Sequence, residues 1–165
     1  MKKGKPLILA IDDEVGVTNL IKNTVEDRLG WNIITANGGK EGLKTLKKHK
    51  TWVGIGPNKI DCVILDIKMP DLDGLDMLRE WRKSEGFYEE MSVIILSAYE
   101  DQKKWAKATS PIVGGAVGYL KKPFNPDELV DVLEKVVIKK HGEYMKDDLR
   151  EKSYVRRKEL EDESK

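Results

Sequence analysis

The sequence predicts a single α/β domain in which a parallel sheet is covered by helices on both faces. Five short apolar runs recur along the chain, and longer amphipathic stretches separate them. The runs are continuously hydrophobic, which is typical of strands buried on both faces of a parallel sheet. Strands that alternate with helices are joined by right-handed crossovers, so a doubly wound sheet is expected. A length of 165 residues fits one such domain.

The apolar runs give the five predicted strands in chain order. They are LILAI (7–11), NIITA (32–36), CVILD (62–66), VIILS (93–97) and VGYLK (117–121). The third run contains Cys62, the only cysteine of the chain, which therefore cannot form an internal disulfide. A small core residue is the expected role of this thiol, and such cysteine usage favours a cytosolic protein.

Two of the predicted helices carry clear sequence signals. The helix after the first strand has an apolar face with helical spacing and ends at Gly30. The last helix has Asn125 as a candidate N-cap, Pro126 at its first position and Glu128 where a capping box places an acid. The two apolar faces are Val17, Leu20, Ile21, Thr24, Val25 and Leu29 in the first helix, and Leu129, Val132, Leu133, Val136 and Val137 in the last.

Two segments lie outside the regular alternation of strands and helices. Residues 49–59 are rich in glycine and show no period, which predicts a loop before the third strand. After residue 140 the chain is densely charged in both signs, which predicts a helical but loosely attached tail. The expected organisation is therefore a domain over residues 1–140 and a tail over 141–165, with no separate output domain and a tail that the fold does not need.

The charge balance limits the classes of partner. Thirty basic residues nearly cancel 29 acidic ones, so the chain lacks the overall basic character of nucleic-acid-binding proteins, and direct nucleic-acid binding is not expected. The apolar run at residues 7–11 is too short for a secretory signal. No run approaches the roughly 18 apolar residues of a membrane span. A cytoplasmic protein without membrane association is expected.

Acidic side chains follow two of the predicted strands directly. Asp12, Asp13 and Glu14 come after the first strand, and Asp66 ends the third. Ligands of doubly wound sheets collect at the carboxyl ends of the strands. If these two strands are neighbours, the acids converge and need a cation, and oxygen-only ligands favour a hard ion such as Mg2+. The alternative for Asp12 or Asp13 is capping of the following helix, which one of the two suffices to provide.

Four separated segments, in order, carry a resemblance to a known family. They are ILAIDDE, VILDIKMPDLDG, VIILSAY and GYLKKPF. With these segments the chain resembles the receiver domain of two-component response regulators, and the likeness extends over about residues 5–140. It is most similar to the single-domain, chemotaxis-receiver-like members. The resemblance implies a flavodoxin-like sheet of five parallel strands in the order 2-1-3-4-5 with helices on both faces.

The resemblance also implies a phosphorylation site. By position, Asp66 matches the phosphoacceptor of the family, while Asp12 and Asp13 match the acidic pair that, with Asp66 and the backbone carbonyl of Lys68, holds Mg2+. The side chains of Lys68 and Tyr99 match two positions that overhang the phosphoryl group. Side chains there are expected to slow dephosphorylation by occupying the approach of the attacking water.

The remaining matched positions contact the phosphoryl group or respond to it. Ser97 matches the hydroxyl residue, and Lys122 matches the lysine that pairs with the phosphoryl group. Lys121, its neighbour, does not fit the family spacing and is assigned to solvent. Tyr119 matches the aromatic residue that switches together with Ser97, although a buried core tyrosine is the alternative. The family also implies a cis peptide bond between Lys122 and Pro123.

The implied function is that of a signalling switch. The protein would take a phosphoryl group from a histidine kinase or a histidine phosphotransfer protein, using Mg2+ as cofactor, and slowly hydrolyse it. It would signal to a downstream protein through its fourth helix, fifth strand and fifth helix. The alternative is a receiver-like binding module that works without phosphorylation, and a dedicated phosphatase is a third and more distant reading.

Two further segments resemble phosphate-handling motifs but are better explained as turns. DLDGL (71–75) resembles the opening motif of haloacid-dehalogenase phosphatases, yet it does not follow an apolar strand directly. It is predicted to be a turn that leads into the third helix. NGGKEG (37–42) lacks the full spacing of a phosphate-binding loop and is also predicted to be a turn.

Overall fold

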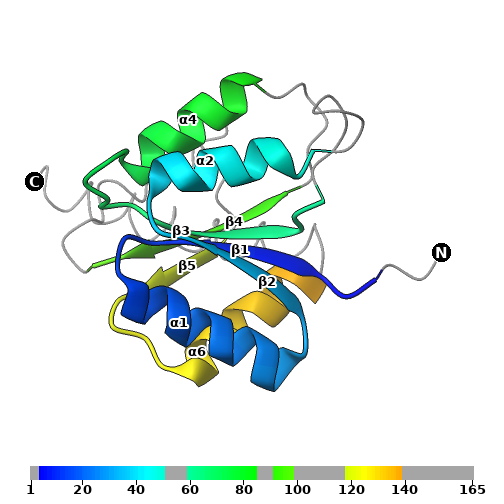
Figure 1. Cartoon of the computed structure of the whole chain (residues 1–165). Coiled ribbons are helices and arrows are strands. Elements are labelled where there is room, and N and C mark those ends of the chain that lie inside the picture. The colour runs from blue at the N-terminus through cyan, green and yellow to red at the C-terminus, as the bar shows by residue number, and fades with distance from the viewer. Residues whose placement is uncertain (1–3, 51–58, 85–90, 99–117, 139–165) are drawn as a thin grey trace, which may run out of the picture.

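The computed structural model describes residues 4–50, 59–84, 91–98 and 118–138, and within them five parallel strands form one sheet (Figure 1). The strand order is β2-β1-β3-β4-β5, and all four neighbouring pairs are parallel. This confirms the predicted flavodoxin-like arrangement. The strands are β1 Leu7–Ile11, β2 Asn32–Ala36, β3 Cys62–Asp66, β4 Ser92–Ser97 and β5 Gly118–Lys121.

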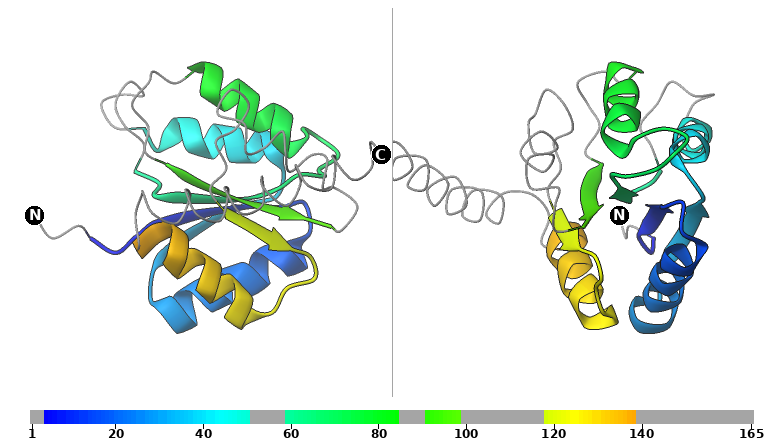
Figure 2. Two further views of the ribbon diagram at one scale, coloured as in Figure 1. Left: turned by 180° about the vertical axis from the view of Figure 1, so that it is seen from behind. Right: turned by 90° about the vertical axis from the view of Figure 1, so that its left-hand side faces the viewer.

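Helices cover the sheet on both faces. Helices α1 and α6 lie on one face, and α2 and α4 lie on the other (Figures 1 and 2). Their bounds are α1 Val15–Thr24, α2 Gly39–Lys48, α4 Gly74–Ser84 and α6 Pro126–Leu133, and a wider π-helical turn extends α1 over Val25–Leu29 and α6 over Glu134–Ile138. The expected helix between β4 and β5, most of the 49–59 loop and the tail lie outside the described residues. None of the described helices has the length and apolar character needed to cross a bilayer.

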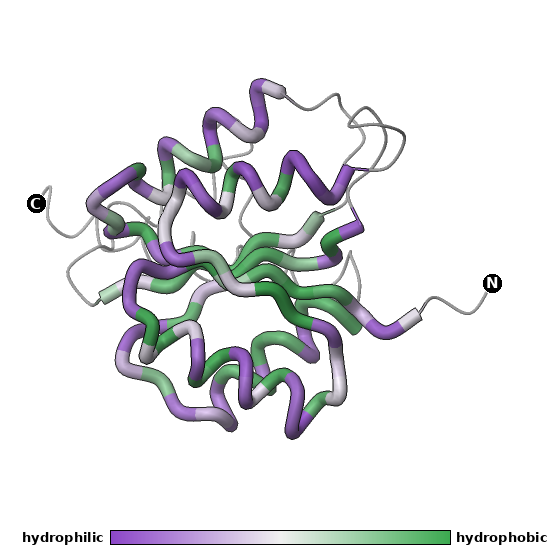
Figure 3. The backbone as a smooth tube through the Cα atoms, viewed as in Figure 1, coloured by the Kyte–Doolittle hydropathy of each residue, from purple (hydrophilic) through white to green (hydrophobic). Residues whose placement is uncertain are grey.

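The core has two halves, one on each side of the sheet. Figure 3 shows that hydrophobic residues dominate the strands, whereas hydrophobic and hydrophilic residues alternate along the helices. Along β1, Leu9 and Ile11 pack toward α2 and α4, whereas Ile8 and Ala10 pack toward α1 and α6. All residues of β3 and β4 are buried. Burial on both faces is the physical reason that these strands are continuously apolar in sequence.

The helix ends agree with the predicted signals in all but one place. Gly30 ends the first helix with a left-handed φ of 62°. The side chain of Asn125 accepts a hydrogen bond from the Glu128 N–H at 3.0 Å, and Glu128 accepts one from the Asn125 N–H at 2.9 Å, which is the predicted capping box. The prediction of a turn over 37–42 is wrong for most of that segment, because α2 already begins at Gly39.

Candidate functional site

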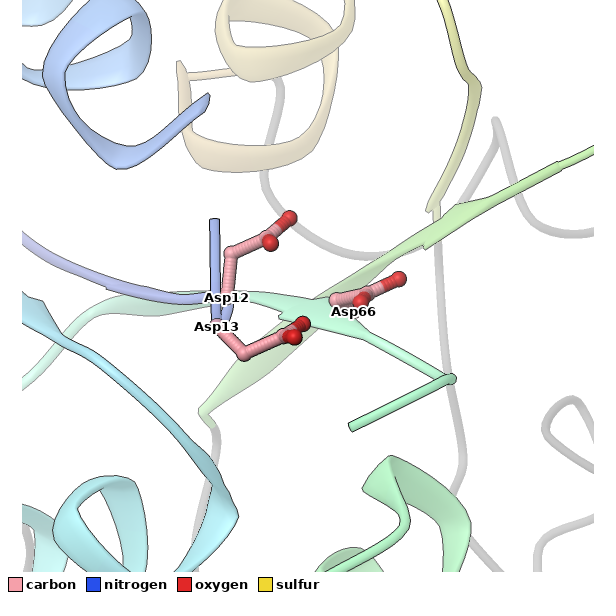
Figure 4. Close-up of side chains that lie close together, drawn as sticks. All are labelled: Asp12, Asp13 and Asp66. Carbon is pink, nitrogen blue, oxygen red and sulfur yellow. The ribbon is translucent and has the colours of Figure 1, made fainter. Parts of the chain in front are cut away.

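The candidate site is built at the carboxyl ends of β1 and β3. These strands are neighbours, with Ile11 paired to Leu65, so that Asp12 and Asp66 follow at the same level of the sheet. Oxygen atoms of Asp12, Asp13 and Asp66 all lie within 4.8 Å of one another, and Figure 4 shows the three carboxylates grouped together. Asp12 and Asp66 are buried, whereas Asp13 is exposed.

Lys122 supplies positive charge to this group of acids. Its Nζ atom lies 2.6 Å from Oδ2 of Asp12, 3.4 Å from Oδ1 of Asp66 and 3.3 Å from Oε1 of Glu14. The backbone N–H of Lys122 donates to the Ser97 carbonyl at 2.9 Å, which ties this residue to the end of β4. The neighbouring Lys121 has an exposed side chain. The arrangement therefore singles out Lys122, and not Lys121, as the lysine of the site.

Burial and mutual repulsion perturb the pKa values of the acids. Burial raises the pKa of Asp66 to about 6, and the charge of Asp12 adds to this effect, while Lys122 opposes it. Burial also raises the pKa of Asp12, although Lys122 and the Glu14 N–H act in the opposite direction. The pKa of Lys122 is raised because the carboxylates of Asp12 and Asp66 outweigh the effect of its own burial. Three buried or half-buried charges thus depend on one another.

Asp12 also forms a hydrogen bond with the backbone that leads into α1. Its Oδ1 atom accepts a hydrogen bond from the N–H of Glu14 at 2.9 Å, one residue before the helix begins. This bond forms a turn before the helix and is not a cap, because the N-cap of α1 is Glu14 and no side-chain cap hydrogen bond is present. The alternative that Asp12 or Asp13 caps α1 is therefore wrong, and the second oxygen of Asp12 faces Lys122.

The other predicted residues lie at different positions around the same edge. Ser97 is buried at the end of β4, beside β3, and its hydroxyl donates to the Ala98 carbonyl at 3.0 Å. Tyr119 is half-buried in β5 and packs against the core that faces α2 and α4. The Lys68 side chain is exposed, two residues beyond Asp66. Tyr99 lies outside the described residues. The peptide bond between Lys122 and Pro123 is cis.

Gly74, at the start of α4, makes a close approach to Asp66. The Gly74 N–H donates to the Ile67 carbonyl at 2.8 Å, and a Cβ atom on Gly74 would lie 2.1 Å from the Asp66 carbonyl oxygen. No side chain fits there unless the backbone moves. Glycine at this position therefore lets the start of α4 pack directly against the backbone of Asp66.

Gly74→Ala is expected to lower the free energy of unfolding by about 2 kcal/mol, because the methyl group clashes with backbone that cannot rotate away. Urea denaturation measures this change. Gly16→Ala in α1 is the matched control, since a Cβ there meets nothing within 4 Å. Its expected effect is neutral or stabilising, as alanine is a better helix former. Equal losses in the two variants would contradict the close packing of Gly74 on Asp66.

Two contacts of this region were not predicted from the sequence. Glu14 contacts Lys122 across a separation of 108 residues, and Asp71 accepts hydrogen bonds from the first N–H groups of α2. Glu14 belongs to the acidic run after β1, but its partner follows β5 and is brought close only by the strand order. The sequence signal for the Asp71 contact is indirect. Helix α2 begins after a glycine that offers no side-chain cap, so its first N–H groups need an acceptor from elsewhere in the chain.

Comparison with known proteins gives one consistent family. The sequence model of the family described as "Response regulator receiver domain" matches residues 8–134. Among curated proteins, the chain is 32% identical over 128 residues to the transcriptional regulatory protein TrcR of Mycobacterium tuberculosis, covering 77% of this chain and 44% of TrcR. It is 33% identical over 132 residues to the two-component response regulator ARR10 of Arabidopsis thaliana, covering 80% of this chain and 21% of ARR10. The chain thus spans less than half the length of these relatives.

Solved structures agree with the sequence comparison. A response regulator receiver domain protein from Clostridium thermocellum is similar with a TM-score of 0.67 at 33% identity, covering 81% of this chain and 95% of that one. The chemotaxis protein CheY4 of Vibrio cholerae is similar with a TM-score of 0.64 at 26% identity, covering 81% of this chain and 99% of that one. The likeness is thus to nearly complete receiver chains.

Proposed function

Because the chain belongs to the response regulator receiver domain family, we propose that it accepts a phosphoryl group on Asp66 from the phosphohistidine of a histidine kinase or a histidine phosphotransfer protein. The observation that carries this proposal is the environment of Asp66. This buried carboxylate ends β3, lies among two further acids and is reached by one lysine. Neighbouring carboxylates would only destabilise an aspartate whose role is purely structural.

The transfer itself requires an ionised Asp66 at a strand end. One Oδ atom of Asp66 attacks the phosphorus atom, the P–N bond to the donor histidine breaks, and the electron pair of that bond stays on the imidazole nitrogen, which then takes up a proton. Burial keeps bulk water away from the carboxylate. It also raises the pKa of Asp66 to about 6, which leaves the group mainly ionised near neutral pH.

The acids offer a fitting site for Mg2+. All their donor atoms are oxygens, which suits a hard cation, and their mutual repulsion is relieved by a divalent charge. Asp12, Asp13, Asp66 and the backbone carbonyl of Lys68 are the groups that would hold it. When bound, Mg2+ would supply positive charge that stabilises the transferring phosphoryl group.

Lys122, Ser97 and Tyr119 are proposed to respond to the phosphoryl group. Lys122 is shared among carboxylates in the unphosphorylated chain, and new phosphoryl oxygens on Asp66 would compete for its ammonium group. Ser97 lies on the adjacent strand β4 and offers a hydroxyl donor without a competing charge. Tyr119 lies on β5, one strand further, and packs on the face of the sheet that α2 and α4 cover. We propose that its ring passes the change to a downstream partner that binds the fourth helix, β5 and the fifth helix, which is α6.

Incubation of the protein with Mg2+ and a small acyl phosphate is expected to add one phosphoryl group, because the receiver itself carries the catalytic groups. Intact-mass analysis detects it. Asp66→Asn is expected to abolish the addition, and a chelator is expected to prevent it in the wild type. Asp76→Asn is the control, since Asp76 is exposed on α4 and pairs with Arg79. A wild type that stays unlabelled with Mg2+ present would favour the binding-module alternative.

Lys68 and Tyr99 are proposed to slow the loss of the phosphoryl group. Hydrolysis needs a water molecule in line with the bond between phosphorus and Asp66, and two long side chains beside the phosphoryl group obstruct that approach. The double variant Lys68→Ala with Tyr99→Ala is therefore expected to lose phosphate faster than the wild type in the absence of any partner. Decay is followed at one Mg2+ concentration and one pH. Equal rates would remove the shielding role and leave the assignment of Asp66 intact.

A further inference from the structure

Helix α2 begins without a cap of its own. Its N-cap residue, Gly38, has no side chain and a positive φ of 139°. A carboxylate from elsewhere takes that place, because Oδ1 of Asp71 accepts the Gly39 N–H at 3.1 Å and Oδ2 accepts the Lys40 N–H at 3.0 Å. Asp71 belongs to the loop that joins β3 to α4. The cap of α2 is therefore a tertiary contact that crosses about 30 residues of sequence.

The glycines of the segment NGGKEG make room for this contact. A Cβ atom on Gly38 would lie 2.8 Å from Oδ2 of Asp71, and one on Gly39 would lie 2.4 Å from the carbonyl oxygen of Leu72. A Cβ on Gly42 would lie 2.5 Å from a methyl group of Ile11, the last residue of β1. The segment that resembled a phosphate loop thus packs closely against the loop after β3 and against the end of β1.

The loop that packs against the start of α2 joins β3 to α4 and begins directly after Asp66. Ile67 and Met69 are buried, and the far end of the loop is fastened where Gly74 packs against the Asp66 carbonyl. Asp71 connects the middle of the loop to the start of α2. Its pKa is lowered, since the slight cost of burial is outweighed by the N–H groups of Lys40 and Gly39, so the ionised carboxylate is the form that is bound.

We propose that Asp71 is a positioning residue, which, by binding the N-terminus of α2, holds the loop that carries the Lys68 carbonyl beside Asp66. The proposal rests on the function proposed above, because the Lys68 carbonyl matters there as a Mg2+ ligand. Helix α2 thereby becomes part of the scaffold of the site, although no residue of α2 belongs to the site itself.

The chain offers a variant that separates positioning of the loop from simple stabilisation of α2. Glu41 also acts at the start of this helix, where Oε2 accepts the Asn37 N–H at 2.7 Å, but this contact does not involve the loop. Asp71→Ala and Glu41→Ala each remove one carboxylate from the same helix end. Asp71→Asn keeps one side-chain acceptor oxygen and serves as the conservative variant.

Three quantities are measured: amide hydrogen exchange of metal-free protein, affinity for Mg2+ alone, and the initial rate of labelling by acyl phosphate. In Asp71→Ala, the amide of Gly74, which closes the loop by donating to the Ile67 carbonyl, is expected to exchange about fivefold faster, the order of a lost helix cap. Mg2+ affinity is expected to fall about tenfold, as when an outer partner of a metal ligand is lost. The initial rate of labelling at low Mg2+ is expected to fall in proportion to the Mg2+ affinity. In all three quantities Asp71→Asn is expected to lie between the wild type and Asp71→Ala, and Glu41→Ala is expected to keep the wild-type values.

Two results would overturn the positioning role. One is an Asp71→Ala protein with the Gly74 exchange and Mg2+ affinity of the wild type. The other is a Glu41→Ala protein that loses as much as Asp71→Ala, because the effect would then come from α2 in general. A wild type that is never labelled would instead defeat the proposed function, and amide exchange in the metal-free proteins would still decide whether Asp71 holds the loop.

Discussion

Lys122→Ala is expected to lower the free energy of unfolding of the metal-free protein by about 3 kcal/mol near pH 7, the order observed when one partner of a buried ion pair is removed. Asp12 is fully buried, and the Nζ of Lys122 lies 2.6 Å from its Oδ2. Asp66 is buried as well and lies 3.4 Å from the same ammonium group. Without Lys122, the two carboxylates repel each other with no nearby compensating charge that the structure shows.

The effect of Lys122→Ala has a defined pH dependence. The pKa of Lys122 is raised by its partners, so its stabilising contribution is present at neutral pH and is lost only above the ordinary lysine range. Lowering the pH instead protonates the partners, Asp66 at about 6, and the deficit of the variant should shrink there. Denaturant titrations of the wild type and Lys122→Ala at several pH values measure this deficit in the free energy of unfolding. Lys121→Ala is the control, and an equal loss in that exposed neighbour would contradict the assignment.

Asp66→Asn is expected to raise the free energy of unfolding of the metal-free protein by up to about 3 kcal/mol near pH 7. The folded pKa of Asp66 is about 6, above the ordinary value of 3.8. A raised carboxyl pKa means that the folded state binds the proton more tightly than the unfolded state does. Stability from this group is therefore complete below 3.8 and is lost as the pH rises through about 6. Asparagine removes that loss.

Chemical denaturation in the presence of a chelator, near pH 7 and again near pH 4, measures the stabilisation by Asp66→Asn. The advantage of the variant should nearly vanish at the lower pH, where Asp66 is protonated. Addition of Mg2+ should stabilise the wild type more than the variant, because only the wild type offers the full set of acids. An Asp66→Asn protein that is less stable than the wild type at both pH values without metal would show that the charge of Asp66 does not destabilise the fold. Asp76→Asn again supplies the exposed control.

Much of the fold could be predicted because its signals are local. Five strands give five short apolar runs, and the capping box at Asn125 is contained in four consecutive residues. The grouping of Asp12 and Asp66 could be predicted in the same way, since both residues end apolar runs and parallel strands end at one edge of the sheet. The strand order itself came from the family resemblance, and the structure confirms it.

The contacts that could not be predicted are those between segments far apart in sequence. Asp71 caps α2 from another loop, so the start of this helix carries no local cap, and its glycines suggested a turn. Glu14 reaches Lys122 only because β1, β3, β4 and β5 are arranged side by side. In both cases the residue type is visible in the sequence, but the partner is fixed by tertiary packing.

Mapping of the modified residue decides whether the phosphoryl group resides on Asp66. Borohydride reduces an acyl phosphate to an alcohol, so a phosphorylated aspartate becomes homoserine, which peptide mass spectrometry locates. After incubation with Mg2+ and acyl phosphate, homoserine is expected at position 66, and it is expected to be absent when Mg2+ is chelated. Homoserine at position 12 or 13, or unmodified Asp66 in protein that has gained a phosphoryl group, would show that Asp66 is not the phosphoacceptor.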